Sequence, residues 1–306
     1  MTQASGGLWV PTSTPFAPNG SVDRNLFLTH CKALLDEGAD GLAILGTTSE
    51  ANSLSVSERA DQLDLLIDND ISPSKLMPGT GACSIEDAVQ LTSAATNAGC
   101  AGVLLLPPFY YKGLSEDGLF AFLSELIERV GAAQLRLYLY HIPPVAQIGY
   151  SLPLIERLLK RYPNTIAGLK DSSGDFDNTL AVIRNFPQLH VFPGSETFLL
   201  DGLRAGAAGC ISATGNINAK AIKEVYVRWK EPNADRLQAA ITRRRKLVEA
   251  YPLIPAVKAV LAARYGDSAW NRVRAPLQSL DGDRASELTD QLAKDGLARA
   301  TTGVVA

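Results

Sequence analysis

The segment Ile166-Ala167-Gly168-Leu169-Lys170-Asp171-Ser172-Ser173-Gly174 contains the pattern from which the fold is predicted. Residues 166–169 are typical of a short buried strand, a lysine follows them directly, and the serines and Gly174 predict a turn. Lysine is rarely buried unless it is paired, and it usually keeps its stem in apolar surroundings with the ammonium in water. Its position alone therefore predicts that Lys170 reaches solvent from the end of a strand.

The same unit of an apolar run, a turn and an amphipathic segment recurs along the chain. The helix-like segments begin at residues typical of helix N-termini, among them Asp23, Ser57, Ser84, Ser115 and Ser151. Eight strand-like runs precede such segments, at residues 8–10, 41–45, 75–78, 102–106, 135–140, 166–169, 189–192 and 209–211. This alternation predicts an α/β fold, the (β/α)8 TIM barrel. A doubly wound open sheet is the alternative, but it usually has fewer strands, and no GxGxxG follows the first run.

Helix-like patterns continue beyond the eighth unit. They cover residues 234–250, 253–265 and 284–298, with prolines between them. A segment of about 75 residues is too long to be a loop. We expect residues 1–230 to form the barrel and residues 231–306 to form a three-helix extension packed on its outside, as one structural unit.

Composition excludes several classes of protein. The chain has 306 residues, 46% of them hydrophobic, and a net charge of −3, which argues against a nucleic-acid-binding surface. The positive segment Arg243-Arg244-Arg245-Lys246 is expected on a solvated helix face or at a subunit contact. The sequence lacks a signal peptide and an apolar run of about 18 residues, so no membrane partner is expected. The four cysteines lack CxxC spacing and are expected to be buried in a reduced, cytoplasmic protein.

Residues that follow the strand-like runs are considered together, because the active site of a TIM barrel lies at the carboxyl ends of its strands. After the second run, Gly46 frees the backbone of Gly46-Thr47-Thr48-Ser49-Glu50, whose amides and hydroxyls are suited to a carboxylate. A plain polar turn is the simpler interpretation. Tyr140 ends the fifth run and offers a phenol for proton transfer, although a single tyrosine is more often a core residue. Together with Lys170, whose burial would favour the neutral, nucleophilic amine, these groups indicate a site for a small 2-oxo acid.

Other types of site lack their signatures. His30, His141 and His190 have neither HxH nor HxxxH spacing, so no metal site is predicted. The GxSxG motif of a Ser-His-Asp hydrolase is absent, as are dinucleotide and thiamine signatures. The sequence therefore predicts chemistry without a metal or cofactor.

These motifs in combination resemble those of the dihydrodipicolinate synthase / N-acetylneuraminate lyase family of class I, pyruvate-dependent aldolases, over roughly residues 8–280. Residues 46–50 resemble the family's GxxGE loop, with Ser49 in place of the second glycine. Tyr140-His141-Ile142-Pro143 resembles YN[VI]P, with His141 in place of asparagine. Gly168-Leu169-Lys170 resembles the GxK segment that carries the Schiff-base lysine.

The resemblance implies a role for each residue. Lys170 forms a Schiff base with the 2-oxo carbon of pyruvate or of the substrate, and the protonated imine allows the neighbouring C–C bond to break or form. Tyr140 relays protons with help from the Thr48 hydroxyl, and Thr47 and Thr48 hold the pyruvyl carboxylate. Tyr110 reaches across a subunit interface in a homotetramer, a dimer of dimers. No cofactor is needed, and the partners are pyruvate and an aldehyde.

Other positions bear on the acceptor. Val145 takes the place of an arginine that grips the second substrate's carboxylate in dihydrodipicolinate synthases. The loop Phe109-Tyr110-Tyr111 resembles that of N-acetylneuraminate lyases, and Glu196 matches an acid that contacts sugar hydroxyls there, but Ser195 replaces its neighbouring aspartate. Ser212 adds a hydroxyl after the eighth run.

The segment 170–174 resembles the branches that act on 2-keto-3-deoxy sugar acids and 4-hydroxy-2-oxoglutarate. The predicted function is therefore that of a Schiff-base aldolase or lyase acting on a 2-keto acid. A dehydratase that uses the same imine, a 4-hydroxy-tetrahydrodipicolinate synthase and a non-catalytic 2-oxo-acid-binding protein are the alternatives.

Overall fold

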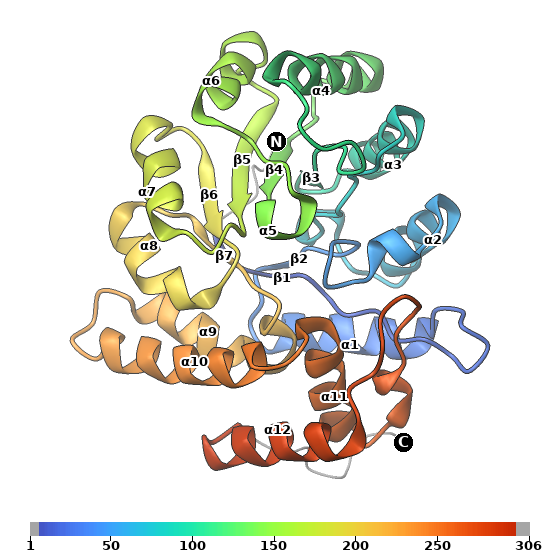
Figure 1. Cartoon of the computed structure of the whole chain (residues 1–306), viewed down its shortest axis with the longest axis vertical. Helices are drawn as coiled ribbons and strands as arrows, with labels where there is room; N and C mark the ends of the chain where they lie inside the picture. Colours follow the sequence, from blue (N-terminus) through green and yellow to red (C-terminus); the bar gives the residue numbers. More distant parts are fainter. Residues whose placement is uncertain (1–5, 298–306) are drawn as a thin grey trace.

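Short parallel strands surround the centre of the molecule in the computed structural model, which describes residues 6–297 (Figure 1). All strand pairs are parallel, in the orders β2-β1-β7 and β3-β4-β5-β6. The strands are β1 (Gly7–Val10), β2 (Gly41–Leu42), β3 (Val103–Leu105), β4 (Leu137–His141), β5 (Ile166–Asp171), β6 (His190–Pro193) and β7 (Gly209–Ile211).

The run at residues 75–78, predicted as a strand, forms isolated bridges between β2 and β3. Leu42 pairs with Leu76, and Gly79 pairs with Leu104. Pro78 has no N–H to donate, which limits regular pairing here, but its carbonyl accepts a hydrogen bond from Leu104 at 2.8 Å. The segment therefore fills the eighth position of the barrel without forming a regular strand.

Backbone hydrogen bonds of Ala208, the residue before β7, link β7 to β6 and to β1. The N–H of Ala208 donates to the carbonyl of Val191 at 2.9 Å, and the carbonyl of Ala208 accepts from Gly7 at 2.8 Å. The strands thus form a closed ring, and the α/β fold with a TIM barrel and C-terminal helices, as predicted, is confirmed.

Helices surround this ring (Figure 1). Ser55, not Ser57 as predicted, caps the second helix, because its hydroxyl accepts from the N–H of Glu58 while the Glu58 carboxylate accepts from the N–H of Ser55. The other predicted caps, Asp23, Ser84, Ser115 and Ser151, are confirmed. The helices are α1 (Arg24–Asp36), α2 (Val56–Asp68), α3 (Ile85–Asn97), α4 (Glu116–Val130), α5 (Pro143–Ala146), α6 (Leu152–Arg161), α7 (Phe176–Asn185), α8 (Leu199–Ala205) and α9 (Gly215–Arg228), with short 3-10 turns at Ala51–Ser53, Pro73–Lys75 and Glu196–Phe198.

The C-terminal part contains α10 (Ala234–Glu249), α11 (Leu253–Tyr265), a 3-10 turn (Ser268–Asn271) and α12 (Gly282–Lys294). Figure 1 shows these helices together on one side of the barrel. The predicted end of the last helix at residue 298 lies outside the described residues. The division at residues 230 and 231 stays a prediction. We call residues 231–297 the C-terminal extension.

The expected surroundings of Arg245 and Cys83 were wrong. Arg245 of the positive segment is not on a solvated face: it is buried, and its Nε donates to Glu249 at 2.6 Å. Cys83 is exposed rather than buried, because it lies in the turn just before the N-cap Ser84. Among residues 6–297, no helix has the length and apolar content needed to cross a bilayer.

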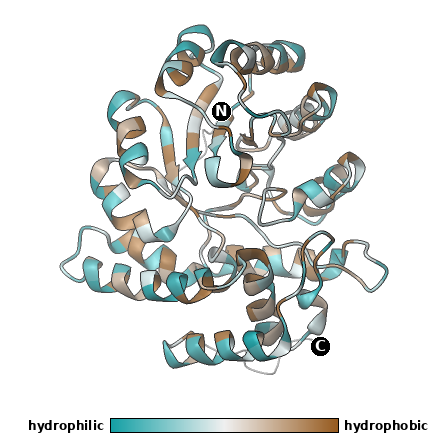
Figure 2. Ribbon diagram, viewed as in Figure 1, coloured by the Kyte–Doolittle hydropathy of each residue, from teal (hydrophilic) through white to brown (hydrophobic). Residues whose placement is uncertain are grey.

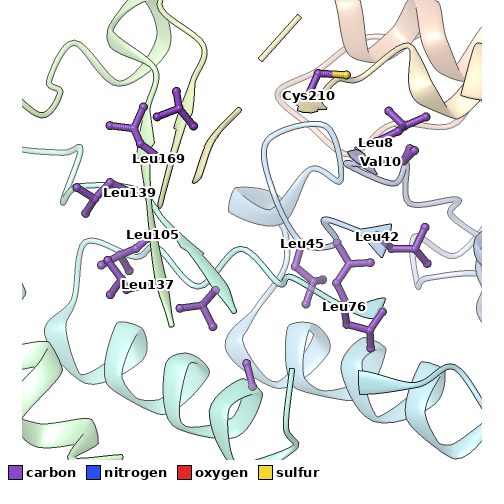
Figure 3. Packing of buried hydrophobic residues seen from close by; sticks show 14 of the residues in the cluster. Leu8, Val10, Leu42, Leu45, Leu76, Leu105, Leu137, Leu139, Leu169 and Cys210 are labelled. Atoms are coloured by element: carbon purple, nitrogen blue, oxygen red, sulfur yellow. The ribbon is translucent and has the colours of Figure 1, made fainter. Parts of the chain in front are cut away.

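Apolar packing follows the strand alternation. Side chains on one face of the strands pack against the helices, as shown by Leu105, Leu139 and Leu169 on adjacent strands (Figure 3). Figure 2 shows hydrophobic residues along the strands and hydrophilic residues on the outer sides of the helices. The opposite face fills the barrel with Trp9, Ala43, Met77, Ala101, Leu104, Tyr138, Ala167, Phe192 and Ile211. The barrel is therefore a packed core, and a site is expected only at its end.

Candidate active site

Lys170 and Tyr140 lie side by side at the carboxyl ends of β5 and β4. The two strands pair with Tyr140 opposite Lys170. The Lys170 Nζ lies 4.1 Å from the centre of the Tyr140 ring, and each residue is 4% exposed. The expectation from position alone, that Lys170 reaches solvent, was wrong, because its side chain packs on this ring instead.

The Tyr140 hydroxyl is surrounded by polar groups. It lies 3.4 Å from the Thr47 Oγ1. Burial alone would raise the pKa of this phenol, but the charge of Lys170 and hydrogen bonds with Thr47, Lys170 and Ser172 outweigh it and hold the pKa below its usual value. The phenol therefore gives up its proton more readily than a free tyrosine, as a proton relay requires.

Thr47, rather than Thr48, is the threonine beside Tyr140. The resemblance assigned the relay hydroxyl to Thr48, which is buried, but within residues 6–297 its side chain makes no hydrogen bond. Successive residues of a turn point in different directions, so only the folded geometry distinguishes the two threonines. The structure thus brings Thr47, Tyr140 and Lys170 together.

The turn of residues 46–50 is closed by its own hydrogen bonds and anchored to the end of β1. The N–H of Ser49 donates to Gly46 and the N–H of Glu50 donates to Thr47. The Ser49 hydroxyl donates to the Thr12 carbonyl at 2.5 Å, and Thr14 donates to the Ser49 carbonyl at 2.8 Å. Ser49, which departs from the family glycine, thus stabilises the turn through its side chain.

The N–H groups of Thr47 and Thr48 have no hydrogen-bond partner in the described part of the chain. Two adjacent free amides beside a lysine are suited to a carboxylate. The sequence predicted this property of the turn from its composition, and the geometry is consistent with it.

Asp171 and Ser172 belong to the same strand end, and the sequence analysis assigned them no role. The Asp171 carboxylate accepts from the N–H of Ser173 at 2.9 Å and from the Thr179 hydroxyl at 2.8 Å, so it fixes the turn between β5 and α7. Ser172 is close enough to Tyr140 to lower the pKa of that phenol. They are the two residues that follow Lys170. Strand alternation could have predicted that Ser172 lies on the same side of the strand as Lys170.

Glu196 and Ser212 were expected to contact substrate. They contact each other instead: the Ser212 hydroxyl donates to one oxygen of the fully buried Glu196 carboxylate, and Thr214 donates to the other. Arg245 of α10 lies 3.6 Å from the same carboxylate. Both oxygens of Glu196 thus accept hydrogen bonds from within the protein, and the contact with sugar hydroxyls stays a prediction.

Tyr110 and Val145 lie on the surface. Tyr110 follows β3, is 74% exposed and stacks edge-on against Tyr111, with ring centres 5.3 Å apart. Within residues 6–297 it makes no hydrogen bond, and its role at a subunit interface stays a prediction. Val145, in α5, is 63% exposed. The loop beyond it is held by His141, whose Nδ1 accepts from the N–H of Tyr150 at 3.0 Å.

A small, partly open pocket is lined in part by Tyr140 and Thr47. Arg59, which the sequence analysis did not single out, is buried there and donates to the Gly79 carbonyl at 2.7 Å. Burial lowers the pKa of Arg59 to about 10. The lining residues are Leu45, Gly46, Thr47, Ala51, Asn52, Arg59, Gly79, Gly81, Leu104, Leu106 and Tyr140. Among residues 6–297, no three His, Cys, Asp or Glu side chains are grouped to hold a metal ion.

Known proteins are similar to this chain over most of its length. An uncharacterized DapA-like lyase from Chloroflexus aurantiacus is 33% identical over 277 residues, which cover 90% of this chain and 92% of the relative. The crystal structure of dihydrodipicolinate synthase from Agrobacterium tumefaciens is 32% identical, has a TM-score of 0.88 and is matched over 96% of this chain and 99% of that one. A variant of the 2-keto-3-deoxygluconate aldolase of Sulfolobus solfataricus shares the fold at 21% identity, with a TM-score of 0.84 and coverage of 94% and 95%.

The match to a family description extends over nearly the whole chain. The Dihydrodipicolinate synthetase family is matched by residues 4–295, which include Lys170, Tyr140 and the turn of residues 46–50. The chain therefore belongs to the Dihydrodipicolinate synthetase family and is a lyase of the pyruvate-dependent, class I aldolase type.

Proposed function

We propose that this protein is a Schiff-base aldolase that cleaves, or forms, the bond between a pyruvate unit and an aldehyde in a 2-keto acid. The observation that carries the proposal is the position of Lys170 against the ring of Tyr140, beside the free amides of Thr47 and Thr48. An amine, a phenol of lowered pKa and a carboxylate-binding turn are the groups that imine chemistry on a 2-oxo acid needs.

In the proposed reaction, the turn binds the carboxylate of the 2-oxo acid and presents its carbonyl carbon to Lys170. The neutral amine adds to this carbon, and Tyr140 donates the proton with which the carbonyl oxygen leaves as water, so that a protonated imine and a Tyr140 phenolate result. In cleavage, a proton from the C4 hydroxyl passes to Tyr140, the C3–C4 bond breaks, and its electrons enter the imine to form an enamine. Protonation of C3 and hydrolysis then release pyruvate and regenerate Lys170.

The acceptor is proposed to be the aldehyde of a 2-keto-3-deoxy sugar acid or of 4-hydroxy-2-oxoglutarate. Val145, which is apolar and exposed at the loop after β4, supports the sugar-acid aldehyde over the glyoxylate that 4-hydroxy-2-oxoglutarate releases, because glyoxylate carries a carboxylate. Self-association is also proposed: Tyr110 and Tyr111 are exposed on one loop. In a homotetramer, Tyr110 would enter the neighbouring subunit's site.

Borohydride trapping tests the proposal. Incubation with pyruvate and borohydride should add one reduced pyruvyl group to the peptide that contains Lys170, and Lys170→Ala should take up none. A wild-type protein that remains unlabelled, or is labelled at another lysine, contradicts the proposal. Product analysis with 2-keto-3-deoxy sugar acids separates the reactions: pyruvate release supports the aldolase, whereas loss of water without pyruvate indicates the dehydratase.

A further inference from the structure

Glu50, the last residue of the carboxylate-binding turn, is held by a buried ion pair with the C-terminal extension. Its Oε1 accepts a hydrogen bond from the Lys258 Nζ at 2.6 Å, and neither side chain is exposed to solvent. Its Oε2 accepts from the backbone N–H of Arg274 at 2.8 Å. Lys258 lies in α11 and Arg274 beyond it, so both oxygens are bound by residues of the extension.

Further contacts fix the same region. Both cations contact the Phe16 ring, with the Lys258 Nζ 4.4 Å and the Arg274 guanidinium carbon 4.9 Å from its centre. Arg274 also donates to the Ser53 carbonyl at 2.7 Å, just beyond the turn. The extension thus binds the turn at its carboxyl end, while Thr12 and Thr14, in the segment after β1, bind it through Ser49.

Stability alone does not explain this ion pair. The free energy lost when two charges are removed from water is about as large as the free energy gained from their attraction. An apolar pair of similar size would therefore stabilise the fold equally well. Glu50 also has a φ of 57°, in the left-handed region that most residues avoid. Such a backbone conformation persists when surrounding contacts hold it, and these residues are often found at functional sites.

The backbone of Glu50 connects this ion pair to the site. Its N–H donates to the Thr47 carbonyl at 3.0 Å and so closes the turn that presents the free amides of Thr47 and Thr48. Thr47 in turn contacts Tyr140. A shift of Glu50 therefore moves the groups proposed to bind the substrate carboxylate.

We infer that Glu50 and Lys258 are positioning residues through which the C-terminal extension sets the geometry of the carboxylate-binding turn. This inference rests on the proposed function, because it assigns the turn to the 2-oxo acid. Neither residue touches the substrate, and the effect is exerted through the backbone of Thr47 and Thr48. The extension is thereby part of the active site's construction as well as of the fold.

The test uses the full-length double variant Glu50→Gln/Lys258→Met, which replaces both charges with neutral side chains of similar length. KM for the 2-oxo acid should rise about tenfold or more, because small misplacements of binding groups are costly, while kcat should fall less. At saturating pyruvate, borohydride should still label Lys170. Glu50→Asp, which keeps the charge but shortens the reach to Lys258, should raise KM in the same direction and serves if the double variant does not fold.

Arg264→Gln is the matched control. Arg264 also lies in α11, and it pairs with Glu37 at the end of α1, away from the turn. This control should leave KM unchanged. Wild-type KM in the Glu50 and Lys258 variants, or an equal rise of KM in Arg264→Gln, overturns the inference. Trapping of pyruvate by the wild type is measured first: its absence contradicts the proposed function, whereas trapping with unchanged KM in the variants contradicts the positioning role alone.

Discussion

The ammonium of Lys170 lies over the face of the Tyr140 ring, 4.1 Å from its centre. A cation in this position is attracted by the electron-rich face of the ring, and the same charge favours ionisation of the Tyr140 phenol. The proposed nucleophile and the proposed proton carrier are thus coupled, because the charge of Lys170 lowers the pKa of Tyr140. This coupling is available because Tyr140 and Lys170 are paired in register on adjacent strands.

Tyr140→Phe should reduce kcat for pyruvate release by about a hundredfold or more, because general acid–base catalysis contributes at least that much when a positioned group moves the proton. Tyr138→Phe is the matched control. Tyr138 lies on the same strand, and its hydroxyl has no hydrogen-bond partner among the described residues. Steady-state kinetics give kcat for both variants. An equal loss of kcat in the two would contradict a specific role for Tyr140.

Thr47→Val and Thr48→Val should affect different kinetic constants. Thr47→Val removes the hydroxyl next to Tyr140, so the pKa of Tyr140 should rise and kcat should fall about tenfold. Thr48→Val leaves that contact intact and should mainly raise KM for the 2-oxo acid. The comparison needs only the two constants for each variant. A loss of kcat confined to Thr48→Val would restore the relay assigned to Thr48 by the resemblance.

Local patterns were enough to predict the barrel and the two strand ends that carry Lys170 and Tyr140. Lys170 and Tyr140 were found because each follows an apolar run, and the carboxyl ends of barrel strands meet at one face. The run at residues 75–78 was also recognised as part of the barrel, although Pro78 prevents regular strand pairing. Periodicity identifies such elements because it depends only on neighbouring residues.

Properties that depend on distant contacts were not predictable in this way. Glu50 and Lys258 are separated by 208 residues, and no local pattern connects a turn after β2 with a lysine in α11. Glu196 and Ser212 were recognised as polar residues at strand ends, but their mutual hydrogen bond is a matter of side-chain direction. For the same reason the sequence did not show that Thr47 is the threonine beside Tyr140.

His30 should make the stability of the protein depend on pH. It is buried, with Nε2 2.9 Å from the Asn216 Oδ1 and Nδ1 2.9 Å from the Tyr265 hydroxyl. Burial is the main cause that lowers the pKa of His30 from 6.5 to about 4. The hydrogen bond to Asn216 partly opposes this decrease, and the nearby charge of Arg264 adds a smaller decrease. The unfolded chain therefore binds a proton first as the pH falls, and the stability present above pH 6.5 is lost as the pH approaches 4.

The loss of unfolding free energy attributable to His30 should be about 3 kcal/mol. Urea unfolding of the wild type and of His30→Gln, each between pH 7.5 and pH 4, measures it as a difference, so carboxylates that titrate in both proteins cancel. His30→Gln should have the shallower pH dependence. Parallel curves for the two proteins would show that His30 does not remain neutral in the folded state.

Val145→Arg should change the preference for the acceptor. Val145 is 63% exposed, so an arginine fits there without repacking, and the family resemblance implies that an arginine at this position binds a carboxylate of the second substrate. Because a charge-assisted hydrogen bond contributes about 1.5–3 kcal/mol, kcat/KM with an acidic aldehyde such as aspartate semialdehyde should rise about tenfold relative to glyceraldehyde. Condensation with pyruvate, followed separately for each aldehyde, gives this ratio.

Val145→Gln is the control for this change, since it adds a polar side chain of comparable reach without a positive charge. If Val145→Gln shifts the ratio as much as Val145→Arg does, charge is not the cause. A third outcome is that neither substitution alters the ratio of kcat/KM for the two aldehydes, while the wild type already prefers the acidic one. The acceptor is then selected by other residues, and the synthase reaction becomes the better interpretation. An increase confined to Val145→Arg would place the choice of acceptor at the loop after β4, apart from the imine chemistry at Lys170.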